Sequence, residues 1–236
     1  MLSLRLPIDD PRPGLAERPE PFIASAGMSL AGGALSDHDV IASGLTDLER
    51  EAMAAQFETA CRYGAAIERV AARHGLLPSI IAGFCSRRSG WGQGLLPNGV
   101  EGTCDLQPRM TDVEGRSSPL PPDGLGFLRG LMGLDFDRHP LAREEGWRDP
   151  ESNIEAAFTL IANYRTQLRR RTTLQGTGLL RASLTAFECG LARVQRAIRL
   201  GQDVDSPTPG WRGLPGRGCG RDVMIRAGFF QSEGWD

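Results

Sequence analysis

Long apolar runs are missing from this chain, since no stretch approaches the roughly 20 consecutive apolar residues that a membrane-spanning helix needs. Excess charge of one sign is missing too, because 27 basic residues against 29 acidic ones leave a net charge of −2. Such a balance gives no basic field for nucleic acid and no cationic patch for a membrane surface. We therefore expect neither a membrane span nor a nucleic-acid partner.

Cysteine patterns that hold metals or build disulfide frameworks are also absent. The cysteines are odd in number, lie far apart and include no C-x-x-C pair. We expect reduced thiols that pack as small hydrophobic side chains, with no metal site and no cofactor. The five positions are Cys61, Cys85, Cys104, Cys189 and Cys219.

The beginning of the chain lacks a convincing signal peptide. Its first residues, "MLSLRLPIDDPRPG", hold a very short apolar run that meets two aspartates and two prolines. Residues 1–45 are rich in Pro, Gly, Ser and Ala without a sustained period, which predicts an extended or partly disordered arm. Residues 46–236 are enough for one sizeable core, so we expect one domain after the arm.

Helical periodicity is the clearest pattern in the chain after the arm. Thr46 and Glu49 form a capping-box pattern ahead of one apolar stripe, which predicts a helix that ends at Gly75. A second helix is expected to begin at Pro78, a favoured first-turn position, and to end at Gly90.

The second half of the chain is expected to be helical as well. Asp149 and Pro150 are typical of a helix start, and an apolar face comes after them. That helix ends in a run of three arginines, which suits the negative end of the helix dipole. Further helices are expected near 177–188, 190–200 and 220–230.

Periodicity is lost between Leu95 and Leu125, where prolines are frequent. A loop of this length inside a compact domain is usually functional or disordered, and we expect at most a small hairpin within residues 95–130. The predicted fold is therefore mainly helical, with a small loop or hairpin lobe. The carboxylates on this loop include Glu101, Asp105 and Glu114, each a candidate replacement acid.

Four motifs, in this order and at this spacing, resemble the goose-type lysozymes and their lytic-transglycosylase relatives. The resemblance covers roughly residues 67 to 230, and the tail "DVDSPTPG…RDVMIRAGFF" is similar to the ending of bacterial members. It implies a lysozyme-like α+β fold in which a small lobe faces a helical domain across a glycan groove. The motifs are "HGLLPSIIAGFCSRRSGWG", "DGLGFLRGLMGLD", "WRDPESNI" and "AFECGLARVQRAI".

The resemblance implies cleavage of the β-1,4 bond between N-acetylmuramic acid and N-acetylglucosamine in peptidoglycan. The family's essential acid is the glutamate of a Ser-Arg-Glu-Ser motif, and Arg88 stands at that position here. A carboxyl group on the apolar face of a helix end has a raised pKa and can protonate the leaving sugar oxygen. A guanidinium keeps its proton throughout the working range and cannot do so.

Other positions of the family's site are partly kept. Asp123 and Asp135 match two aspartates that help to place the attacking water, although their spacing here is one residue longer. The family's Tyr-Asn is Phe187-Glu188, and its Gln before the last aspartate is Gly133.

The candidate substrate-binding residues are therefore Trp91, Met132, Gly133, Phe187 and Glu188, and the rings of Trp91 and Phe187 are expected to stack on sugar faces. Each assignment has a structural alternative: Arg88 as a cation that ends its helix, Asp123 and Asp135 as turn caps, and Trp91 as part of the core.

Three functions compete at this point. The first is a catalytically impaired lysozyme-like protein that keeps glycan or partner binding, with peptidoglycan strands or a cell-wall protein as the partner. The second is an active muramidase or transglycosylase whose acid is Asp105 or Glu101 on the loop. The third is an interaction protein with a relic groove. The missing signal predicts a cytoplasmic location, whereas action on peptidoglycan requires an exported or cell-envelope location.

Overall fold

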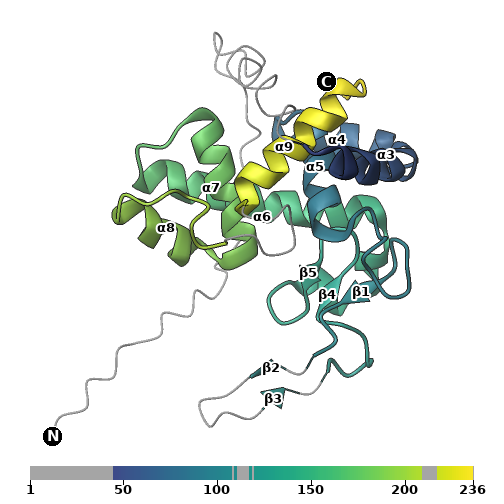
Figure 1. Cartoon of the computed structure of the whole chain (residues 1–236). Coiled ribbons are helices and arrows are strands. Elements are labelled where there is room, and N and C mark those ends of the chain that lie inside the picture. Colours follow the sequence, from purple (N-terminus) through teal and green to yellow (C-terminus); the bar gives the residue numbers. More distant parts are fainter. Residues whose placement is uncertain (1–44, 108, 111–116, 119, 209–216, 236) are drawn as a thin grey trace, which may run out of the picture.

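The computed structural model describes residues 45–107, 109–110, 117–118, 120–208 and 217–235, so that residues 1–44 of the expected arm and Glu114 lie outside it. Within the described residues the chain is mainly helical with a small antiparallel sheet, as the sequence predicted (Figure 1). The helices are α3 (Asp47–Cys61), α4 (Gly64–His74), α5 (Pro78–Ser89), α6 (Pro150–Arg171), α7 (Gly176–Cys189), α8 (Leu191–Arg199) and α9 (Cys219–Ser232), with 3₁₀ turns η1 (Pro140–Arg143) and η2 (Glu145–Arg148).

The helix boundaries lie at the capping residues. The Thr46 side chain accepts a hydrogen bond from the Glu49 backbone N–H, and the Glu49 side chain accepts one from the Thr46 N–H, which completes the predicted capping box. Asp149 caps α6 by accepting from the Ser152 N–H at 2.8 Å. Gly90 ends α5 in the left-handed conformation at φ 57°, which favours glycine.

The single helix expected between Thr46 and Gly75 is wrong, because the chain breaks at Arg62 and Tyr63 between α3 and α4. Tyr63 has φ −109° and ψ 10°, outside the helical region, and its ring stacks on Trp91 with centroids 6.0 Å apart. We attribute the break to this contact between distant residues, since the apolar spacing itself continues through the junction.

The core centres on α5, in which every residue from Ser79 to Ser89 is buried. α9 packs closely along it, and a Cβ atom at Gly83 would lie 2.7 Å from the Ala227 backbone nitrogen. α7 packs against both α6 and α9, and salt bridges of Arg69 and Arg73 to Glu151 link α4 to α6. α5 itself packs against α3, α4 and α9.

The predicted loop lobe contains two small sheets. β1 (Thr103–Cys104), β4 (Leu128–Arg129) and β5 (Leu134–Asp135) form an antiparallel sheet in the order β1-β4-β5, with Leu128 opposite both Cys104 and Asp135. β2 (Arg109–Met110) and β3 (Ser117–Ser118) form a separate antiparallel pair. In the described part of the chain, no helix is both long and apolar enough to span a membrane.

Candidate functional site

The site suggested by the sequence lies at the carboxyl end of α5. Arg87 and Arg88 occupy its last turn and are 4 % and 9 % exposed, so both guanidinium groups are inside the protein. An isolated buried charge is very costly, and such groups persist only with partners. The partners of these two arginines therefore define what the site can do.

Arg88 is bound on each of its three nitrogens. Its Nε donates to the Met132 carbonyl oxygen at 3.0 Å, and its Nη2 donates to the Gly133 carbonyl oxygen at 3.2 Å. Its Nη1 lies 2.9 Å from Oε1 of Glu188 in a buried salt bridge. The guanidinium also lies 5.4 Å from the centre of the Phe187 ring. Arg88 thus joins α5 to the turn before β5 and to the end of α7.

Gly133 makes a close steric contact with Arg88 as well as a hydrogen bond. Its φ is 57°, and a Cβ atom there would lie 2.8 Å from Nη2 of Arg88. A side chain at this position would therefore have to displace the guanidinium from its partners. Arg88, Gly133 and Glu188 are in direct contact, so a change at one of them affects the others.

Arg87 extends the buried network toward α9. Its Nη1 lies 2.5 Å from Oδ2 of Asp222, and its Nε lies 3.6 Å from Oε2 of Glu188. Burial alone would lower the pKa of Arg87, but the nearby charges, including those of Glu188 and Asp222, outweigh it and raise that pKa. Asp222 also pairs with Arg226 at 3.2 Å. Sequence reasoning missed Asp222 and Arg226, although their i,i+4 spacing on α9 was a visible signal.

Asp105 and Asp135 meet on a single arginine in the loop lobe. Arg109 donates to Oδ2 of Asp105 through Nε at 3.0 Å and also through Nη2, and its Nη1 lies 2.9 Å from Oδ2 of Asp135. Asp137 is bound by the same Nη1 at 3.3 Å, and the guanidinium lies 4.1 Å from the Phe127 ring centre. Asp105 and Asp135 are thus brought together, but the Arg109 guanidinium lies between them.

Asp123 pairs with a different arginine. Arg129 binds both of its carboxylate oxygens, at 2.6 and 2.8 Å, and this fork lowers the pKa of Asp123. Asp123 also accepts from the Leu125 N–H, so it caps a turn as the structural alternative expected. The loop residue Glu101 is exposed before β1.

Trp91 and Met132 lie in the core, which contradicts their assignment as glycan contacts. Trp91 is 1 % exposed, stacks on Tyr63 and packs edge-on against Trp235 at 6.5 Å. Met132 is fully buried, and its sulfur lies 3.7 Å from the Cys85 sulfur. Both residues support the end of α5 from within, because neither presents a free face to solvent. Phe187 is half-buried and packs edge-on against Phe84 at 5.3 Å.

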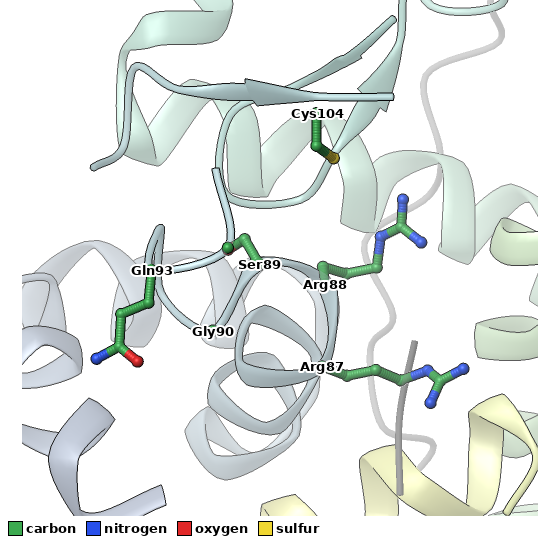
Figure 2. A pocket seen from close by; sticks show the side chains of 7 residues that line it. Arg87, Arg88, Ser89, Gly90, Gln93 and Cys104 are labelled. Atoms are coloured by element: carbon green, nitrogen blue, oxygen red, sulfur yellow. The ribbon is translucent and has the colours of Figure 1, made fainter. Parts of the chain in front are cut away.

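An open depression of about 560 Å³ lies beside the end of α5. Figure 2 shows Arg87 and Arg88 extending to one side of it, with Gln93 on the other side and Cys104 opposite the helix end. No group of three His, Cys, Asp or Glu side chains in the described residues is arranged to hold a metal ion. The depression is lined by Arg87, Arg88, Ser89, Gly90, Gln93, Gly94 and Cys104.

No known protein-family model matches this chain, and no curated protein matches it. The chemistry open to the site must therefore be argued from its own residues. At the end of α5 these are a bound cation and a buried carboxylate, and in the loop lobe they are carboxylates paired with arginines.

Proposed function

We propose that this protein is a catalytically impaired, lysozyme-like relative of the goose-type lysozymes and lytic transglycosylases, which binds peptidoglycan glycan without cleaving it. The observation that carries the proposal is the fixed position of the Arg88 guanidinium, bound by Glu188 and two backbone carbonyls. Arg88 stands at the position that the motif resemblance matches to the family's acid. In this proposal its guanidinium therefore takes the place of the group that protonates the leaving sugar oxygen.

The other half of the hydrolytic chemistry is also impaired in this proposal. A carboxylate that positions water needs a free oxygen facing the substrate. Asp135 shares Arg109 with Asp105, and Asp123 is bound on both oxygens by Arg129. These ion pairs favour a structural role for the loop lobe.

The loop-acid alternative has less support than the impaired enzyme. It requires Asp105 to face Asp135 across an open groove at about 6.5–9.5 Å, with room for a water. Arg109 fills the space between these carboxylates, and it binds both. Arg109 therefore competes with any sugar hydroxyl for both carboxylates.

Glycan binding is supported by the depression beside α5. Its volume, about 560 Å³, falls within the range of about 300–1,000 Å³ typical of small-ligand sites. The exposed Gln93 side chain offers an amide at its rim, and amides make the hydrogen bonds that sugar hydroxyls require.

A cleavage assay on purified peptidoglycan tests the catalytic half of the proposal, and we expect no activity above background from the wild-type protein. Arg88→Glu alone should stay inactive, because the new carboxylate would face Glu188 where Nη1 now lies 2.9 Å away. The triple variant Arg88→Glu, Phe187→Tyr, Glu188→Asn removes this repulsion and restores the family's side chains. Activity in the wild type that Asp105→Asn abolishes and Arg88→Ala spares would establish the loop-acid enzyme instead.

Co-sedimentation with insoluble peptidoglycan tests the binding half. Gln93→Ala at the rim of the depression should weaken retention several-fold, since one lost hydrogen bond contributes about 0.5–1.5 kcal/mol. Gln167→Ala, an exposed change on α6, is the matched control and should leave retention unchanged. A wild-type protein that never sediments with peptidoglycan would contradict glycan binding and favour the relic groove.

A further inference from the structure

The net charge of −2 conceals a strong separation of charge along the chain. Between Ala156 and Gln202 there are eight arginines and one acidic residue, Glu188. The totals of 27 basic and 29 acidic residues leave 19 basic and 28 acidic residues for the rest of the chain. The even balance that argued against a cationic membrane patch therefore does not hold locally.

These arginines gather on one part of the fold, which we call the arginine lobe: the end of α6 from Tyr164 onward, α7 and α8. Its small core joins Leu168 of α6 to Ala186 of α7 and Val194 of α8. Figure 1 shows α7 and α8 at one end of the molecule and α3 and α4 at the opposite end. Six arginines of the lobe are exposed: Arg169, Arg170, Arg171, Arg193, Arg196 and Arg199.

Carboxylates do not neutralise this surface within the part of the chain that the structure describes. Glu188 is buried against Arg87 and Arg88, while Asp203 and Asp205 bind Arg181. None of the six exposed arginines makes an ion pair with a described acidic residue. The lobe therefore presents concentrated positive charge to solvent.

α8 adds an exposed apolar residue to this charge. Its own apolar residues pack into the small core, so Arg193, Arg196 and Arg199 face outward. Leu200 comes directly after them and is 61 % exposed, with its backbone N–H bonded to the Arg196 carbonyl. A leucine among arginines fits the boundary between lipid headgroups and acyl chains, where cations meet phosphate and apolar groups meet hydrocarbon.

Nucleic acid fits the same surface less well. Single strands are usually bound on exposed aromatic platforms, whereas Tyr164 and Phe187 in this lobe are half-buried. Double-stranded DNA would use the cations but would offer nothing to Leu200. We propose that the arginine lobe is a docking surface for an anionic lipid bilayer, a property independent of glycan binding.

Co-sedimentation with vesicles tests this proposal directly on the full chain. We expect binding to vesicles of phosphatidylcholine with one quarter phosphatidylglycerol, little binding to pure phosphatidylcholine, and release at 0.5 M salt. Each surface arginine contributes roughly fivefold to affinity for an anionic membrane. Arg196→Gln with Arg199→Gln should therefore weaken binding by more than about tenfold. The charge-matched control Arg50→Gln with Arg62→Gln, on α3 and just after it at the opposite end, should have little effect.

Leu200→Ser separates a bilayer from other polyanions. It should weaken vesicle binding without changing binding to a short double-stranded DNA, because only the bilayer receives the leucine. The proposal would be overturned if the lobe variant and the control variant lost vesicle binding equally. It would also be overturned if the protein bound neutral and anionic vesicles equally well. Tighter binding to DNA than to vesicles, insensitive to Leu200→Ser, would assign the lobe to nucleic acid instead.

Discussion

The Nη1 atom of Arg88 lies 2.9 Å from Oε1 of Glu188, which links the end of α5 to the end of α7 inside the protein. Glu188 also lies 3.6 Å from Arg87, which in turn binds Asp222 on α9. Arg88 and Glu188, which are 100 positions apart in the sequence, therefore form one ion pair in space. The positive charge at position 88 and the negative charge at position 188 compensate each other inside the protein.

Glu188→Gln should strongly destabilise the protein. It leaves two buried arginines with one carboxylate fewer, and breaking a buried ion pair in this way costs about 3–5 kcal/mol. Urea unfolding should measure this loss, and adding Arg88→Met should recover part of it. Glu58→Gln breaks the exposed pair with Arg62 and serves as the control, with a cost below about 1 kcal/mol. A Glu188→Gln cost equal to that of the control would contradict the buried network.

Gly133→Ala should cost more stability than Gly124→Ala. Both glycines have left-handed backbones, with φ of 57° and 70°, so both substitutions carry about 1–2 kcal/mol of backbone strain. Only at Gly133 would the new Cβ meet Arg88, at 2.8 Å, while Gly124 has open space. Thermal unfolding of the two variants measures the stability lost in each, and the difference between the two losses reports the contact with Arg88. This difference should shrink in an Arg88→Met background. Equal losses would show that the guanidinium does not occupy this space.

Glu151 should make stability depend on pH in the acid range. Hydrogen bonds from Arg69 and Arg73 lower the pKa of Glu151 from 4.5 to about 2. The ionised carboxylate therefore adds to the free energy of unfolding above pH 4.5, and this contribution is lost as pH falls toward 2. The melting-temperature difference between wild type and Glu151→Gln should therefore be larger at pH 7 than at pH 3. Glu145→Gln, in an exposed pair with Arg148, is the control, with little difference at either pH. A Glu151→Gln difference that is independent of pH would contradict the assignment.

The cysteines should react as thiols in an order set by burial. No disulfide bond joins them, so unfolding without a reductant should release five titratable thiols. In the folded protein the exposed Cys61 should react first, while burial raises the pKa of Cys85 and Cys219 and suppresses their thiolates. Burial also raises the pKa of Cys189 to about 11. A count of one thiol with two bridges would contradict the structure.

The capping residues were sufficient to predict three helix boundaries: the start of α3, the end of α5 and the start of α6. Thr46 with Glu49, Asp149 with Pro150, and Gly90 act on the backbone within one turn, so their effect is readable without the rest of the molecule. The break at Tyr63 was not readable in this way. It accompanies a ring contact with Trp91, which is distant in the sequence.

The sequence by itself determined the mainly helical class, the small lobe after α5, and the presence of two arginines at the end of that helix. These features depend on local periodicity, capping and residue identity. Only the tertiary structure decided what each charged residue meets: Arg88 meets Glu188, Asp105 and Asp135 share Arg109, and Asp123 meets Arg129. The physical reason is that a side chain's charge can be read from its type, but its partners come from other elements of the fold, which no local pattern specifies.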